Sequence, residues 1–255
     1  MSTLLGKNTF GALICALACS SVAVASTITF TGSGTSSGGN PENASVNIVT
    51  GAGTVTVTLF NLLSNPNDVG QNISDLFFSL SNGATSGTLS SSSGTELTVN
   101  SGGTYVVGST VTTGWVLTSM GTSVLLEVLG TPEAPAHTII GTSSNGTYSG
   151  GTYSNANASI AGNGPHNPFL ESGATFLLSF PTVTASTTVT TATFSFGTAA
   201  GNTLTATASG SATATPEEVP TALVGVGLLA IGILRRRAAS YLFARAPEEP
   251  ITTQR

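Results

Sequence analysis

Lysine and arginine are missing from most of this chain. Six of its 255 residues are basic, and none of them falls between positions 26 and 216: they are Lys7, Arg235, Arg236, Arg237, Arg245 and Arg255. Nucleic-acid binding requires basic side chains that replace the counterions of the phosphates. The composition therefore excludes nucleic acid as a partner of the central region, and it disfavours anionic membranes and acidic polysaccharides.

The same interval does contain acidic residues, which have no basic residues to pair with. They are Glu42, Asp68, Asp75, Glu96, Glu127, Glu133 and Glu171. Like charges raise the pKa of one another's carboxyl groups. We therefore expect folded-state carboxyl pKa values above the unfolded ones, and a folded state that keeps or gains stability between about pH 7 and about pH 4. Neutral glycans remain candidate ligands.

The chain also contains few cysteines, and their positions restrict disulfide formation. The two cysteines, Cys15 and Cys19, both lie within the first 25 residues, so the rest of the chain has none. Exported domains often contain disulfide bonds, but this one would depend on hydrophobic burial alone. A length of roughly 190 residues is enough to bury a core in one domain.

The first 25 residues have the composition of a secretory signal peptide. Lys7 precedes an apolar stretch from Phe10 to Ala18, and the small residues Ala23 and Ala25 follow. A basic start, an apolar middle and a small-x-small end are typical of such signals, and they predict cleavage after Ala25. A lipoprotein signal that ends at Cys19 is the alternative.

Groups that could catalyse a reaction are also scarce. Besides the acids, the interval from 26 to 216 offers two histidines, His137 and His166. No Gly-x-Ser-x-Gly motif precedes a helical segment, and no spacing singles out a pair of carboxylates for glycoside hydrolysis. We expect no catalytic site and no cofactor. His137 should be an exposed residue at a strand end, and His166 a hydrogen-bonded loop residue.

One acidic turn resembles a metal site in composition. Its residues Asn65, Asn67, Asp68, Asn72 and Asp75 offer the oxygen ligands that calcium prefers, but their spacing matches no known calcium loop. We interpret the segment as a hydrogen-bonding turn between two strands, and we predict no metal site.

Aromatic side chains could form a platform for sugar rings. Trp115 is one candidate, but we expect it in the core instead. Tyr105, Tyr148 and Tyr153 are the other candidates for an exposed platform, and Tyr148 and Tyr153, which lie in a glycine-rich segment, are the better ones.

The interval from 26 to 208 is rich in alternating sequence. In residues 54–59, threonine alternates with valine or leucine, which places apolar side chains on one strand face and hydroxyls on the other. Strands are predicted near 27–31, 44–50, 53–61, 74–81, 95–99, 104–107, 114–118, 123–129, 174–180, 188–197 and 203–208. Many short strands separated by turns predict an all-β fold, an antiparallel β-sandwich or jelly roll.

One strand breaks its own alternation. Val189 and Phe194 cannot both face the core by strict period two. A β-bulge, which adds one residue to a strand, would restore the pattern. We predict such a bulge near Thr190-Thr191.

The C-terminal part has three sections. Residues 209–218 are expected to form a linker, which contains most of the Pro/Glu cluster Pro216, Glu217, Glu218 and Pro220. An uncharged apolar run closed by Arg235, Arg236 and Arg237 occupies 219–237, and at about 1.5 Å per residue its apolar part spans about 24 Å. This length predicts a short transmembrane helix, with a buried core helix as the alternative. The arginines would hold 238–255 in the cytoplasm.

This order of a Pro-Glu motif, a short Gly/Leu-rich helix and an arginine cluster resembles the PEP-CTERM sorting signal. The resemblance covers residues 215–237, with Pro216-Glu217-Glu218 where the family has Pro-Glu-Pro. It implies processing by an exosortase, an integral-membrane cysteine protease and transpeptidase of bacteria that usually make exopolysaccharide. It also implies a location on the cell-envelope membrane or the extracellular surface, with exopolysaccharide as a candidate partner.

Together these patterns predict an exported, membrane-anchored surface or extracellular-matrix protein with a structural, non-catalytic role. The alternative is a carbohydrate-binding module tethered near the envelope, which would use exposed aromatics and calcium. Coplanar exposed aromatics beside an acidic cluster would favour the module. Buried aromatics under a hydroxyl-covered surface would favour the structural role.

Overall fold

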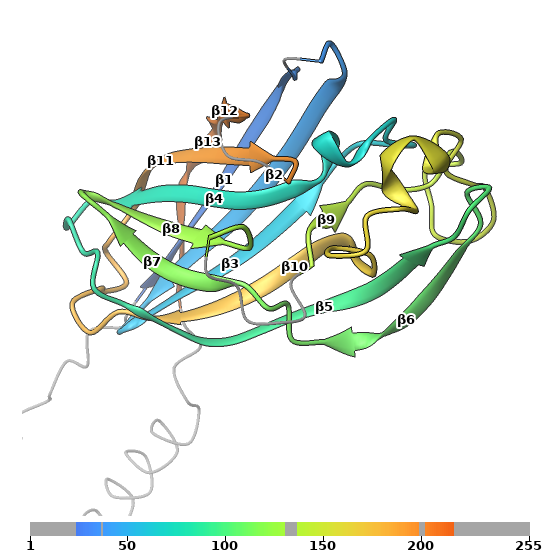
Figure 1. Ribbon diagram of the computed structural model, residues 1–255. Helices are drawn as coiled ribbons and strands as arrows, with labels where there is room; N and C mark the ends of the chain where they lie inside the picture. The colour runs from blue at the N-terminus through green and yellow to red at the C-terminus, as the bar shows by residue number, and fades with distance from the viewer. Residues whose placement is uncertain (1–23, 37, 131–136, 199–201, 217–255) are drawn as a thin grey trace, which may run out of the picture.

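The computed structural model describes residues 24–36, 38–130, 137–198 and 202–216 (Figure 1). These residues form strands joined by loops and two short helical segments, so the predicted all-β class is confirmed. The strands are β1 (Val24–Thr35), β2 (Pro41–Gly51), β3 (Thr54–Asn61), β4 (Ile73–Leu80), β5 (Thr88–Val99), β6 (Tyr105–Val111), β7 (Val116–Met120), β8 (Ser123–Glu127), β9 (Ile139–Ile140), β10 (Phe169–Ser179), β11 (Val189–Phe196), β12 (Thr203–Thr205) and β13 (Thr207–Pro216). The helical segments are η1 (Val69–Gln71) and η2 (Ala156–Ile160).

The strands belong to one mixed sheet. Its main path runs β12, β11, β4, β9, β10, β3, β2, β1, β13, while β5 and β6 branch from β10, and β8 and β7 branch from β4. Among the described strands, the pairing of β9 with β10 is parallel and the others are antiparallel. The short β9 joins the two halves of the sheet, because it pairs with β4 on one side and with β10 on the other.

Alternation decides which face each strand buries. On β3, Val57 pairs with Ile48 of β2 and Phe176 of β10, and all three side chains are fully buried. The next residue, Thr58, pairs with Thr175 of β10 on the opposite face, which is turned toward solvent. The threonine-rich pattern of the sequence therefore gives one apolar face and one hydroxyl face.

The apolar face encloses a large cluster, which we call the main core. Side chains from β1, β2, β3 and β10 meet side chains from β4, β8 and β11 in it. Its bulkiest fully buried or nearly buried members are Trp115, Phe78, Phe176, Phe180, Phe194 and Phe196. The predicted core position of Trp115 is confirmed: its ring lies 5.1 Å from that of Phe176, and its Nε1 donates a hydrogen bond to the carbonyl of His137 at 2.7 Å.

A smaller apolar cluster, called the second cluster, lies under the loops that connect β9 to β10. Its buried members are Leu97, Val99, Ile140, Tyr153, Ala156, Ile160 and Phe169. The end of β5 supplies two of them, and η2 and the tyrosine-containing loop supply three. The main core is thus formed by strands, whereas the second cluster is formed by loops that pack against the edge of the same sheet.

The predicted bulge in β11 is confirmed. The pairing of β11 with β4 shifts between Val189 and Thr191, so Thr190 is the inserted residue. Val189 and Phe194 then both reach the main core. The short strand expected after His137 is the two-residue β9; its bounds were not predicted, because Ile139–Ile140 is too short to show any alternation.

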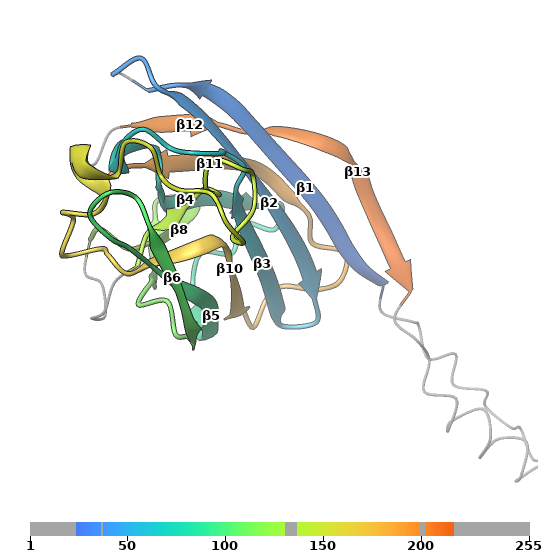
Figure 2. The ribbon, with the colours of Figure 1, turned by 90° about the vertical axis from the view of Figure 1, so that its right-hand side faces the viewer.

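The predicted linker is wrong for residues 209–216. These residues lie in β13, which pairs with β1 along the edge of the sheet, as Figure 2 shows. An edge strand obtains backbone hydrogen bonds from its neighbour whatever its side chains are. A run of serine, alanine and threonine therefore forms a strand without contributing large apolar residues.

Several predicted segments lie outside the described residues. They are residues 1–23 of the signal peptide, the end of the linker at 217–218, the helix at 219–237 and the tail at 238–255. Within the described part of the chain, the structure contains no helix with the length and apolar character needed to cross a bilayer.

Candidate functional site

The two predicted processing points meet at one end of the molecule. In the β1–β13 ladder, Val24 pairs with Pro216 and Ala25 pairs with Thr215 (Figure 2). Of the sequence-predicted signal residues, Ala25 and Pro216 are therefore placed on neighbouring strands. The remaining ones, Ala23, Glu217, Glu218, Pro220, Arg235, Arg236 and Arg237, lie outside the described residues.

His137 is not the exposed residue that the sequence predicts. It is 1% exposed, and its Nδ1 donates a hydrogen bond to the Pro168 carbonyl. Its Nε2 has no hydrogen-bond partner and lies 3.6 Å from the carboxylate of Glu96. Its backbone N–H donates to the Thr113 carbonyl, so main-chain bonds hold it inside the fold. His166, as expected, is a half-buried loop residue whose backbone N–H donates to the Asn163 carbonyl.

The tyrosines do not form an exposed platform. Tyr153 is 1% exposed and donates from its hydroxyl to the Gly141 carbonyl at 2.8 Å. Tyr148 is half-buried and donates to the Ile140 carbonyl at 3.3 Å. Tyr105 meets both of them edge to face, with ring centroids 6.5 Å and 5.6 Å away. Burial raises the pKa of Tyr148 and Tyr153, so both stay neutral hydrogen-bond donors.

The asparagine-rich turn is built from hydrogen bonds to other loops. The side-chain oxygen of Asn65 accepts from the Ser154 backbone at 2.8 Å, and that of Asn67 accepts from Asn155 at 2.6 Å. The described residues contain no group of three acidic, histidine or cysteine side chains that could hold a metal ion. These hydrogen bonds connect the loop before η1 to the loop before η2.

Asp75 is the buried acid of the main sheet. It is 8% exposed, and its Oδ1 accepts a hydrogen bond from the Val128 backbone at 3.3 Å. It pairs with Glu127 across β4 and β8. Burial raises the pKa of Asp75 to about 6; the Val128 bond acts in the opposite direction, and the Glu127 carboxylate adds to the rise. The rise in the pKa of Asp75 has the direction expected from the sequence, but burial is its largest cause and repulsion by the Glu127 carboxylate a smaller one.

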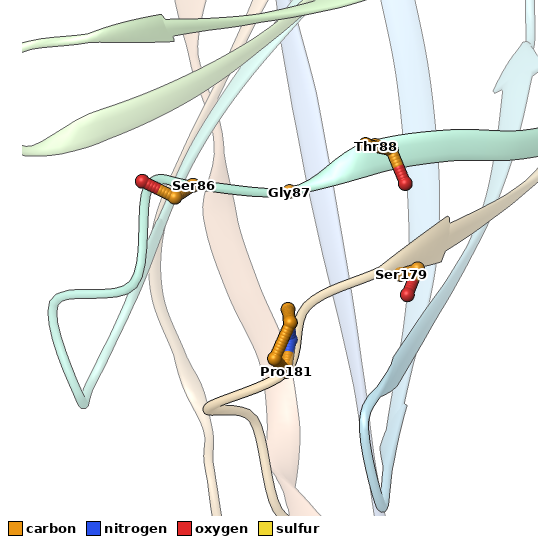
Figure 3. A pocket seen from close by; sticks show the side chains of 5 residues that line it. All are labelled: Ser86, Gly87, Thr88, Ser179 and Pro181. Atoms are coloured by element: carbon orange, nitrogen blue, oxygen red, sulfur yellow. The ribbon is translucent and has the colours of Figure 1, made fainter.

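A shallow pocket of about 290 Å³ lies between the start of β5 and the end of β10 (Figure 3). Ser86, Gly87, Thr88, Ser179 and Pro181 line it. Thr88 of β5 pairs with Ser179 of β10. Figure 3 shows the hydroxyls of both residues on the same side of the two strands. The lining has hydroxyls but no titratable group, so it can form hydrogen bonds and cannot move protons by itself.

A second groove of about 300 Å³ crosses the solvent face of β3, β10, β5 and β6. Its walls include Phe60, Glu171 and the hydroxyls of Thr58, Thr175 and Ser93. Phe60 is 38% exposed, although the aromatic residues of the main core are buried. Burial raises the pKa of Glu171. This groove combines an aromatic ring, a carboxylate and hydroxyls, whereas the pocket at Ser179 and Pro181 has no aromatic ring and no carboxylate.

A bulge in β10 shapes this groove. Leu170 pairs with Glu96 of β5 and Ala174 pairs with Gly94, so three residues of β10, 171–173, face the single residue Thr95. At the same point β10 changes its other neighbour from β9 to β3. Ser172 has a φ of 43°, in the left-handed region that residues other than glycine rarely adopt.

The sequence did not single out this groove. Its residues come from four strands and are polar types that occur throughout the chain. One signal was present: Phe60 follows the alternating run of β3 at a position where the pattern requires a polar residue.

No protein-family model, curated protein or solved structure matches this chain.

Proposed function

We propose that this protein is exported and anchored in the cell-envelope membrane, where it acts as a structural component of the cell surface or extracellular matrix. Residues 26–216, which include β13, would form the exported body, folded as a β-sandwich or jelly roll. Residues 219–237 would form the transmembrane anchor, sorted by an exosortase-type transpeptidase that acts at Pro216-Glu217-Glu218.

The pairing of β1 with β13 carries the proposal. Because Ser26, the first residue left after the predicted cleavage, pairs with Ala214, the chain enters and leaves the described fold at the same end. Before cleavage, the signal peptide, whose last residues Val24 and Ala25 begin β1, and the anchor after β13 would then lie at the same end of the body. This arrangement supports a body that stands on the membrane by one end, as a surface protein requires.

The composition of the body adds support. Its solvent faces bear hydroxyls and a few carboxylates, and no lysine or arginine lies between positions 26 and 216. The main core joins side chains from both halves of the sheet, which is the enclosure expected of two packed layers. We therefore propose a role that uses the body of the protein and needs no catalysis.

Intact-mass measurement of the protein from fractionated producing cells tests this proposal. Removal of residues 1–25 and association with the envelope are expected, and cleavage near Pro216 would remove roughly 4 kDa more from the 25.3 kDa chain. Replacement of Arg235, Arg236 and Arg237 by glutamine should reduce the envelope-associated fraction, because these charges would fix the orientation. Arg245→Gln is the matched control. Full-length protein in the cytosol with residues 1–25 intact would overturn the proposal.

The alternative, a tethered carbohydrate-binding module, loses the platform that the sequence suggested, because Tyr153 is buried and Tyr105 and Tyr148 meet edge to face. The groove that contains Phe60 and Glu171 is the observation that favours a glycan ligand at a different place.

A further inference from the structure

The solvent face of the sheet has polar side chains in register across five strands. Thr29 of β1 pairs with Asn47, Asn47 with Thr58, Thr58 with Thr175, and Thr175 with Ser93 of β5. Neighbouring strands lie about 4.8 Å apart, so this row presents a polar group at each step of that length. A chain of linked sugars carries hydroxyls along its length and could bond to such a row at several points.

Phe60 and Glu171 stand beside this row, at the bulge of β10. Phe60 pairs with Gly173. A Cβ atom at Gly173 would lie 2.7 Å from the Phe60 ring and 2.7 Å from the Leu59 carbonyl oxygen. The ring therefore lies directly against the backbone of Gly173, where only glycine fits, and keeps part of its surface exposed.

The groove is already shaped before any ligand arrives. Ser172 holds a left-handed backbone conformation at the bulge, and β3, β10 and β5 fix the strands around it through their ladders. Backbone strain held by surrounding structure occurs frequently at ligand sites. A rigid groove loses little conformational entropy on binding.

The charges of the groove select the class of ligand. It contains one carboxylate, Glu171, and no basic group. A carboxylate accepts hydrogen bonds from sugar hydroxyls, and an aromatic face packs against the C–H face of a sugar ring. An anionic polysaccharide would be repelled by Glu171 and would find no basic partner.

We propose that this groove, with Phe60 as the stacking ring and Glu171 and Thr58 as hydrogen-bonding groups, binds a neutral glycan chain. The proposal rests on the proposed surface location, because the ligand would be a matrix polysaccharide outside the cell. The groove would then be the point where the body contacts the matrix.

Calorimetric titration of the full-length protein with neutral oligosaccharides tests the site. The protein should be held in a detergent without sugar headgroups, and the panel should contain cello-, xylo-, manno- and malto-hexaose, with oligogalacturonate as the anionic probe and spermidine as the cationic one. Binding of at least one neutral oligosaccharide is expected. Phe60→Ala should weaken that binding about tenfold, and Glu171→Gln several-fold.

Val106→Ala is the matched control, because Val106 is 60% exposed on β6 and does not line the groove. Melting curves of each variant should show that the fold is kept. The proposal is overturned if no neutral oligosaccharide binds, if Phe60→Ala and Glu171→Gln bind as the wild type does, or if oligogalacturonate or spermidine binds more tightly than the neutral sugars. A processed, envelope-associated protein that binds no sugar would overturn the glycan site alone. A chain that binds sugar but remains unprocessed in the cytosol would overturn the surface role alone.

Discussion

The main core and the second cluster are stabilised in different ways. In the main core, strands such as β2, β3 and β10 satisfy their backbone groups in regular ladders, and burial of apolar side chains supplies the stability. In the second cluster, side chains satisfy the loop backbone: Tyr153 donates to the Gly141 carbonyl, and Asn167 bonds both the N–H and the carbonyl of Val99. The first depends on apolar area, and the second depends on individual hydrogen bonds.

Truncation of a central apolar residue should break the main core most strongly. Phe176 is fully buried, pairs with Val57 and packs on Trp115. Phe176→Ala removes apolar area and leaves a cavity, so the free energy of unfolding should fall by about 3 to 5 kcal/mol. Denaturant titration of the full-length protein measures this change.

The adjacent residue provides the control. Leu177 is 39% exposed on the opposite face of β10, so Leu177→Ala should lower the free energy of unfolding by about 1 kcal/mol or less. Equal effects at the two positions would contradict the assignment of faces, and with it the position of the main core.

The pH dependence of stability should distinguish the two regions. The folded-state pKa of Asp75 is raised from 3.8 to about 6, so the folded protein binds this proton more tightly than the unfolded chain does. The stabilisation is complete below the unfolded pKa and is lost as the pH rises through the folded pKa. The free energy of unfolding should therefore increase by roughly 2 to 3 kcal/mol from pH 7 to pH 4, and Glu42 and Glu171, whose pKa values burial also raises, act in the same direction.

Asp75→Asn tests which group is responsible. The amide oxygen can still accept from the Val128 N–H, while the charge is gone. The variant should be more stable than the wild type at pH 7, and most of the pH dependence should disappear. A protein that loses stability between pH 7 and pH 4 would show that burial of carboxylates is not the dominant electrostatic effect.

The main core was largely predictable because its physics repeats along the chain. Alternation in residues 54–59 identified β3 and its buried face, and the conflict between Val189 and Phe194 located the bulge at Thr190. Both predictions depend on residues that are close to one another in the sequence. The edge strand β13 was missed beyond residue 208, since its pairing with β1 comes from a segment about 190 positions away, and its small side chains carry no periodic signal.

The second cluster and the groove were not predictable for a related reason. The burial of Tyr153 depends on a close approach to Gly103, where a Cβ atom would lie 2.1 Å from the Tyr153 carbonyl oxygen. His137 is buried because Thr113 and Pro168 accept its hydrogen bonds. Each contact joins loop positions with no common period, so composition suggested exposed residues where the fold buries them.

The smallest expected effect belongs to the second cluster. Tyr153→Phe keeps the ring in place but removes the hydroxyl that donates to the Gly141 carbonyl at 2.8 Å. A buried carbonyl without a donor costs about 1 to 2 kcal/mol, and this cost should appear as faster amide hydrogen exchange in the loops around η2. Exchange in β2, β3 and β10 should change less, if the second cluster opens separately from the main core.

Tyr105→Phe is the matched control for this variant, because the Tyr105 hydroxyl donates to the Gly150 carbonyl at 2.8 Å in an exposed position, where water can replace it. Its effect should be smaller than that of Tyr153→Phe. Since Tyr148 and Tyr153 are neutral throughout the range from about pH 4 to about pH 7, local opening of the second cluster should also vary less with pH than the global stability that Asp75 controls. Equal acceleration of amide hydrogen exchange in the strands of the main core by Tyr153→Phe would contradict this prediction. The two clusters would then unfold as one cooperative unit, although different contacts stabilise each of them.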